Sequence, residues 1–124
     1  MSAAAFPPGF AVGVRRFNTG DYFEAHEAWE ECLDEVEEDE RWDLLVALIQ
    51  VAVGYHKLAS GNVGASRMLS LGAEKLGAFP DVVRGVEVAA LRRRAEADAA
   101  AIDAGGAAER LLAHPPAIRA ASAG

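Results

Sequence analysis

The sequence predicts an all-α fold, a single compact array of about five helices around a buried central helix. Apolar residues recur at helical spacing along most of the 124 residues. No run alternates apolar and polar residues between hairpin turns, so no strand is expected. Residues 44–55 are apolar on every side, which is typical of a helix surrounded by its neighbours. We expect this segment to lie within the central helix.

Two helices are expected before the central one. The first spans about 10–17 and ends near Gly20, which suits the left-handed conformation that closes many helices. The second spans about 22–36 and follows Asp21. With Glu24 three residues later, Asp21 has the spacing of a capping box, in which each side chain binds a free backbone amide at the helix start. The acidic residues that follow are expected to end this helix.

Three helices and a tail account for the rest of the chain. The central helix spans about 41–60 and ends at Gly61. A fourth spans 63–76, and its small residues would let a neighbouring helix come close. Asp81 is expected to cap a fifth, Ala-rich helix that continues toward Gly105. The remaining residues are expected to become ordered only against the body of the protein or a partner.

The composition is that of a globular protein, with 52% hydrophobic and 25% charged residues. Cys32 is the only cysteine, so neither an internal disulfide nor a cysteine-based zinc site is expected. The first ten residues lack the features of a signal peptide, and no apolar run is long enough to cross a membrane. We therefore expect a cytoplasmic protein with no membrane partner.

The formal net charge of −7 is unevenly distributed. Residues 21–43 hold twelve acidic residues and a single basic one, Arg41. The only dense basic run is 92–94, too small for the basic face with which proteins neutralise phosphates. Nucleic acid is therefore not an expected partner, and both charge runs are interpreted as solvated helix surface.

Polar residues on the second helix share a stripe with aromatic ones. At 100° per residue, Tyr22, His26 and Trp29 fall on one face, and Glu30 lies about 40° from His26. We expect His26 and Glu30 to point into the core together. If the second and central helices are antiparallel neighbours, His56 lies within about one helical turn of His26.

Three interpretations of these inward polar residues remain open. In the first, a hydrogen-bonded His/Glu cluster orders the core. In the second, His26, Glu30 and His56 bind a metal ion such as Zn, Fe or Mn, completed by Glu27 or water. In the third, the same region forms a small-ligand pocket. That pocket would also be lined by Tyr22, Trp29, Gln50 and Tyr55.

Three blocks of sequence resemble the domain of unknown function family 309 (DUF309). They are residues 17–30, which include His26-Glu27-Ala28-Trp29-Glu30, residues 48–56 and residues 61–65. The resemblance covers about 17–79 and implies a small all-helical domain, but no activity, substrate or cofactor. The family's polar positions map onto Asn18, His26, Glu27, Glu30, Gln50, His56 and Asn62. A tryptophan frequent in the family is replaced here by Cys32 and Leu33, so the packing there is expected to differ.

The sequence as a whole predicts a single domain over 1–124, with an Ala-rich helix and tail over about 81–124. The expected function is that of a structural or interaction module that self-associates. The alternatives are a metal-binding protein or metal-dependent enzyme, and a small-ligand binder; no reaction class or cofactor is defined. The candidate site residues are Asn18, Tyr22, His26, Glu27, Trp29, Glu30, Gln50, His56 and Asn62.

Overall fold

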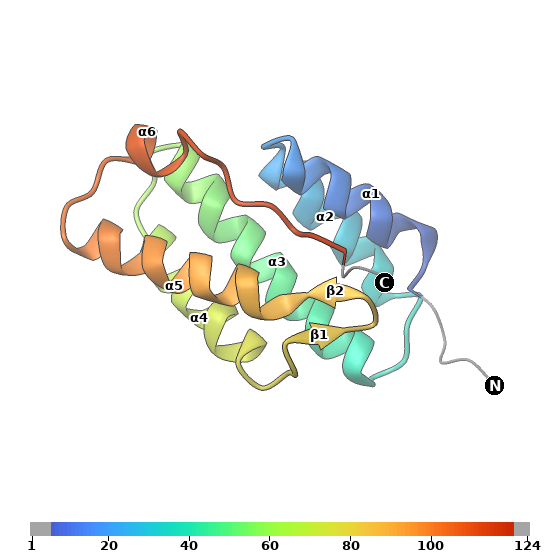
Figure 1. Ribbon diagram of the computed structural model, residues 1–124. Helices are drawn as coiled ribbons and strands as arrows, with labels where there is room; N and C mark the ends of the chain where they lie inside the picture. Colours follow the sequence, from blue (N-terminus) through green and yellow to red (C-terminus); the bar gives the residue numbers. More distant parts are fainter. Residues whose placement is uncertain (1–5, 121–124) are drawn as a thin grey trace.

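The computed structural model describes residues 6–120 and confirms the all-α class (Figure 1). The first residues of the chain and the last four of the predicted tail lie outside this range. The elements are α1 (Pro8–Asn18), α2 (Tyr22–Leu33), α3 (Glu40–Ala59), α4 (Ala65–Leu76), β1 (Val82–Val83), β2 (Val86–Glu87), α5 (Val88–Asp103) and α6 (Ala108–Leu111).

Consecutive helices pack side by side, from α1 against α2 through to α4 against α5. This order leaves α1 and α5 on opposite sides of α3. The chain after α6 then runs back between α1 and α5, in front of α3 in the view of Figure 1. The predicted tail is therefore ordered against the body of the protein as far as residue 120.

Helix α3 supplies more of the core than any other helix, as predicted for the central helix. Leu44, Leu48, Val51 and Tyr55 are fully buried and recur at intervals of four and three residues. Glycine lets α3 and α4 approach closely, because a Cβ atom at Gly72 would lie 2.6 Å from Val51 Cγ2. The expected small-residue contact is therefore between α3 and α4.

A second close approach joins α1 to α2. A Cβ atom at Gly13 would overlap the Trp29 indole ring, which is fully buried beneath α1. The Trp29 Nε1–H donates a 3.1 Å hydrogen bond to the Phe10 carbonyl. Phe17 packs edge-on against the rings of Tyr22 and Tyr55, so aromatic side chains from three helices meet in the core.

The segment between α4 and α5 corrects the expectation that the chain has no strands. β1 and β2 form a two-stranded antiparallel hairpin. Its turn residues Arg84 and Gly85 have φ values of 48° and 81°, the left-handed conformation that two-residue hairpin turns require. Arg84 also forms a 2.6 Å ion pair with Glu40 at the start of α3. Asp81 was predicted to cap the fifth helix, but α5 begins only at Val88, with Glu87 at its N-cap position. The Asp81 backbone carbonyl accepts the amides of Val88 and Ala89 across the hairpin.

The start of α2 also differs from its prediction. Gly20 has the expected left-handed φ of 86°. Asp21, however, makes no side-chain capping bond. Its carboxylate instead accepts a 3.2 Å hydrogen bond from the Thr19 hydroxyl and lies 3.9 Å from Arg16, so the capping-box prediction is wrong. None of the helices formed by residues 6–120 combines the length and apolar character of a membrane span.

Candidate functional site

The buried face of α2 is rotated from the predicted one. Tyr22, Ala25, Trp29 and Cys32 are buried, so the face is centred between Ala25 and Tyr22 rather than toward His26. Glu30 lies about 100° from Trp29 around the helix, and its side chain is 56% exposed. The prediction that Glu30 points into the core is therefore wrong.

His26 lies at the edge of this face, with its side chain 16% exposed. Its Nδ1 is 2.6 Å from the Phe23 carbonyl oxygen, and its Nε2 is 3.2 Å from Glu30 Oε1. Both partners are hydrogen-bond acceptors, so each contact needs a hydrogen on the ring nitrogen that makes it. The His26–Glu30 pair lies within one helix and does not join α2 to α3. Glu27, one residue further on, is exposed.

Phe23 brings the two predicted histidines near one another at the surface. Its ring centroid is 4.9 Å from that of His26 and 5.3 Å from that of His56 on α3. Phe23 itself is 44% exposed. Helices α2 and α3 are therefore close here, as predicted, but the two histidines meet through the partly exposed ring of Phe23.

The predicted metal ligands do not assemble. Among residues 6–120, no group of three or more His, Cys, Asp or Glu side chains is arranged to hold a metal ion. The set of His26, Glu30 and His56 is not brought together, because Glu30 points outward and Phe23 contacts both imidazoles.

The remaining predicted site residues are dispersed. Trp29 and Tyr22 belong to the aromatic core. The backbone of α1 at Gly13 packs directly against the Trp29 indole ring and leaves no space there. Gln50 lies on the flank of α3, with its Oε1 buried and unpaired among the described atoms. Asn62 is exposed beyond the end of α3. The predicted ligand pocket is therefore not formed around Trp29.

A buried polar network that the sequence analysis missed links α3 to α5. The Tyr55 hydroxyl donates a 2.6 Å hydrogen bond to Asp98 Oδ2, and the Arg94 Nε–H donates to the same oxygen at 2.8 Å. Asp98 is 5% exposed. Its position seven residues after Leu91 places it on the apolar stripe of α5, the one sequence signal that could have found it.

Burial sets the chemistry of the tyrosines in this network. Desolvation raises the pKa of Tyr55 far above its ordinary value, and the hydrogen bond to Asp98 raises it further. Burial also raises the pKa of Tyr22, whose ring centroid is 5.5 Å from that of Tyr55. Tyr55 therefore remains a hydrogen-bond donor to Asp98 and is unsuited to act as a base or nucleophile.

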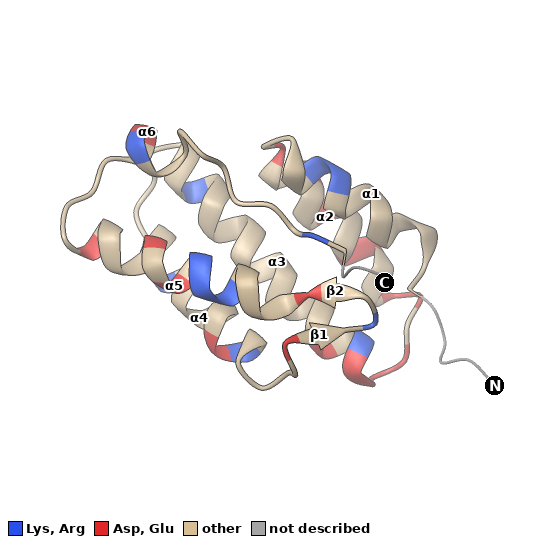
Figure 2. Ribbon diagram, viewed as in Figure 1, with Lys and Arg blue, Asp and Glu red and all other residues tan. Residues whose placement is uncertain are grey.

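The same network fixes the chain after α6. The Arg94 Nη2 group donates hydrogen bonds of 2.8 and 2.6 Å to the carbonyls of Leu111 and His114. On α1, Asn18 Nδ2 donates to the Ile118 carbonyl at 3.0 Å, and Asn18 Oδ1 accepts the Ile118 amide at 2.7 Å. Asn18, predicted as a site residue, thus binds backbone rather than the histidines. Figure 2 shows the charged residues of α5 beside this segment.

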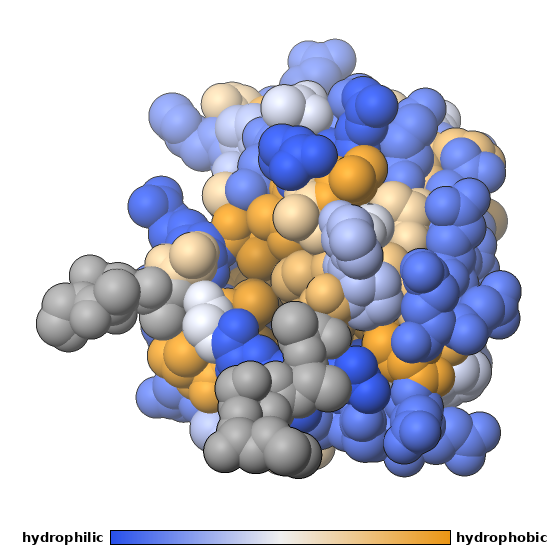
Figure 3. All heavy atoms as spheres, turned by 90° about the vertical axis from the view of Figure 1, so that its right-hand side faces the viewer, coloured by the Kyte–Doolittle hydropathy of each residue, from blue (hydrophilic) through white to orange (hydrophobic). Residues whose placement is uncertain are grey.

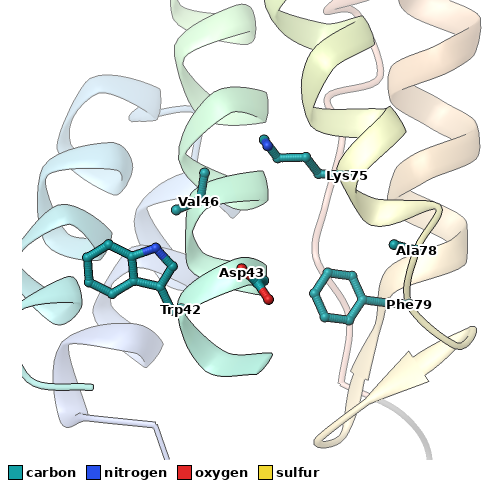
Figure 4. Close-up of a pocket in the computed structure, with 6 residues that line it drawn as sticks. All are labelled: Trp42, Asp43, Val46, Lys75, Ala78 and Phe79. Carbon is teal, nitrogen blue, oxygen red and sulfur yellow. The ribbon is translucent and has the colours of Figure 1, made fainter. Parts of the chain in front are cut away.

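A second apolar surface runs along α3, on the side away from the core. Trp42, Val46, Ile49 and Val53 lie on it, all only partly buried. We call these four residues the outer face of α3. At its N-terminal end, a hollow of about 410 Å³ separates α3 from the end of α4 (Figure 4). Its lining residues are Trp42, Asp43, Val46, Lys75, Ala78 and Phe79.

Comparison with known proteins identifies a family over about half of the chain. No curated protein and no solved structure matches it. A family model matches residues 10–69, which include α1, α2, α3 and the start of α4. Asp98, Arg94 and the C-terminal segment lie outside the matched residues. Residues 10–69 match the model of the domain of unknown function DUF309, which confirms the resemblance found in the sequence.

Proposed function

We propose that this protein is an interaction module that self-associates through the outer face of α3. The observation that carries the proposal is the spacing of Trp42, Val46, Ile49 and Val53, which follow one another at intervals of four, three and four residues. This is the spacing of a coiled-coil seam, at which one helix packs against another. Helix α3 thus has one apolar seam in the core and a second that is left partly exposed.

The exposed neighbours of this seam extend the apolar surface. Phe23 on α2 is 44% exposed, and Phe79 beyond α4 lines the hollow next to Trp42. A contiguous apolar surface rimmed by charged residues is typical of protein interaction sites. Asp43 and Lys75 are the charged residues among those that line the hollow, and Asp43 lies between Trp42 and Phe79 (Figure 4).

Charge complementarity favours an antiparallel pair of α3 helices from two copies. Asp43 is near the N-terminal end of α3 and Lys57 near its C-terminal end, on the same side of the helix by the 100° rule. Antiparallel packing about the middle of the seam places Asp43 of one copy about one and a half helical turns, roughly 7.5 Å along the axis, from Lys57 of the other. Parallel packing would instead place like charges together, which is unfavourable.

The test is the mass of the protein in solution, measured by sedimentation equilibrium over a range of concentrations. The buffer is reducing, in keeping with the cytoplasmic location inferred from the sequence. We expect dimers for the unmodified chain and, at micromolar concentrations, monomers for Val46→Glu, because a charge in the seam would be buried without a partner. Val63→Glu is the matched control, since Val63 is 92% exposed and follows the C-terminal end of α3, outside the outer face. An unmodified chain that is monomeric throughout would overturn the proposal.

A charge exchange tests the antiparallel arrangement. Asp43→Lys and Lys57→Glu should each weaken the dimer, and the double variant should restore it. Far-ultraviolet circular dichroism confirms that each variant is folded. Failure of the double variant to recover, with both single variants weakened, would contradict the antiparallel pairing.

A further inference from the structure

The groove between α1 and α5 holds the C-terminal segment, residues 112–120, as it would hold a bound peptide. Side chains distant in sequence bind its backbone: Asn18 contacts both the amide and the carbonyl of Ile118, and Arg94 contacts the carbonyl of His114. Hydrogen bonds of this kind recognise the extended backbone of a peptide and do not depend on the identity of its side chains.

The segment also adds to the edge of the hairpin. The Glu87 amide donates to the Arg119 carbonyl at 2.9 Å, and Val86 pairs with Ala120 in an antiparallel bridge. Pro116 and Ile118 are buried, whereas the residues on either side of each are exposed. Backbone pairing with alternate side chains buried is the pattern of β-strand addition by peptides.

The connection to this segment is attached to the body mainly through α6, where Ala108 and Leu111 pack against the core and Arg94 binds the Leu111 carbonyl. Helix α5 ends at Asp103, and Gly105 follows in the left-handed conformation with a φ of 90°. The short helix α6 has no fully buried residue. Beside Ile118 the groove also contains a hollow of about 240 Å³, whose apolar walls include Phe10, Val14 and Val86. Apolar side chains gather on this end of the molecule in Figure 3.

We propose that the α1–α5 groove is a peptide-binding site, and that residues 112–120 of a second copy bind in it in exchange for the chain's own segment. An exchanged segment makes the same contacts with Asn18, Arg94 and the hairpin, so exchange loses no interaction within the groove. The tether keeps the chain's own segment at an effective concentration in the millimolar range, so exchange becomes extensive as the protein concentration approaches it.

The first test uses the ¹⁵N-labelled full chain and an unlabelled synthetic peptide of residues 112–120. At millimolar peptide, we expect the amide signals of Ile118 and Arg119 to move to the positions of a disordered chain. The Asn18 side-chain amide should keep its bound position, because the peptide takes the place of the released segment. A peptide carrying Ile118→Asp should leave the Ile118 and Arg119 signals in their original positions. Native peptide that also leaves the spectrum unchanged would overturn the proposal.

A second test uses the full-length Ile118→Asp variant, whose own segment should leave the groove. We expect fluorescently labelled native peptide to bind this variant at least tenfold more tightly than the unmodified chain. Adding Asn18→Ala to the variant should remove most of that gain. A folded Ile118→Asp chain that binds native and Asp-substituted peptides equally would contradict the proposal.

A third test separates the groove from the outer face of α3. The Val46→Glu variant, in which the α3 contact is blocked, should still form dimers at millimolar concentration, and adding Ile118→Asp should abolish them. Val46→Glu that remains monomeric at this concentration would overturn exchange between copies. That outcome would leave the proposed α3 contact intact.

Discussion

The hydroxyl of Tyr55 and the carboxylate of Asp98 join the central helix to α5 through a 2.6 Å hydrogen bond inside the core. Arg94 donates to the same carboxylate oxygen and also to the carbonyls of Leu111 and His114. A continuous polar chain therefore runs from the C-terminal part of α3 to the segment that closes the gap between α1 and α5. Its members are charged or buried, so each bond depends strongly on its neighbours.

Replacing Tyr55 by Phe should destabilise the protein by about 1.5–3 kcal/mol, the range for hydrogen bonds to charged groups. The change leaves the ring in place and removes the hydroxyl that Asp98 accepts from. Urea unfolding monitored by circular dichroism measures the loss. Arg92→Ala is the control, because it breaks an ion pair with exposed Glu96 and should cost less than about 1 kcal/mol. Equal effects of the two substitutions would contradict this account.

The two buried tyrosines, Tyr22 and Tyr55, should make the protein less stable at alkaline pH. Burial raises the pKa of both Tyr22 and Tyr55 above the ordinary value of 10.0. Above about pH 10 the unfolded chain loses these protons while the folded protein keeps them, so the free energy of unfolding falls as pH rises. Each tyrosine contributes at most about 1.4 kcal/mol per pH unit.

Unfolding measured between pH 8 and pH 11 tests this dependence. Below pH 9 the contribution of Tyr55 is fully present and constant. Above pH 10 the unmodified chain should lose stability more steeply than Tyr55→Phe, which has no hydroxyl to titrate at that position. Parallel curves for the two proteins would show that Tyr55 ionises as readily in the folded state as in the unfolded one.

The contact between Gly13 and Trp29 predicts that the stability cost of a substitution at Gly13 depends on the residue at position 29. Gly13→Ala should destabilise the protein by about 1–3 kcal/mol, because the added methyl group overlaps the indole ring. In a Trp29→Phe background the same change should cost at least about 0.5 kcal/mol less, since the smaller ring leaves room. A double-mutant cycle by urea unfolding measures the coupling. Additive effects would contradict steric overlap with the indole ring as the cause.

Helical periodicity was sufficient to predict the class and order of the main helices. Residues 44–55 are apolar on all sides, and no local pattern competes with a helix there. The hairpin was missed because β1 and β2 have two residues each, too few for alternation to be detected. Asp81 was predicted to cap the fifth helix, but the hairpin follows it and α5 begins only at Val88, with Glu87 at its N-cap position.

The candidate site was less predictable because side-chain direction depends on a small rotation of α2. A shift of the buried face toward Ala25 turns Glu30 outward and leaves His26 at the edge. The Tyr55–Asp98 contact depends on residues 43 apart in sequence, and no local spacing reports it. Asn18 was recognised as a candidate, yet its partner Ile118 is 100 residues away.

The exposed position of Glu30 predicts a small effect of its removal. Glu30→Ala should change the free energy of unfolding by less than about 0.5 kcal/mol, the usual size of an exposed pair four residues apart on a helix. His26→Ala should cost about 1 kcal/mol or more, because the imidazole packs against Phe23 and is largely buried. Urea unfolding compares them. A loss above about 2 kcal/mol for Glu30→Ala would instead indicate a buried, partnered carboxylate.

The two bonds between Asn18 and Ile118 predict how the C-terminal segment is released. Asn18→Ala removes both bonds, each contributing about 0.5–1.5 kcal/mol, so the Ile118 amide should exchange with solvent about 5- to 150-fold faster. Asn18→Asp keeps an acceptor for the Ile118 amide but places a second carboxylate oxygen against the Ile118 carbonyl. Because two acceptors then face each other, Asp should release the segment at least as readily as Ala.

Asn62→Ala is the matched control, since Asn62 is exposed beyond α3 and should leave Ile118 exchange unchanged. Hydrogen exchange followed by NMR measures each rate. If Asn18→Asp protected Ile118 as well as asparagine does, the donor bond from Nδ2 would contribute nothing to holding the segment.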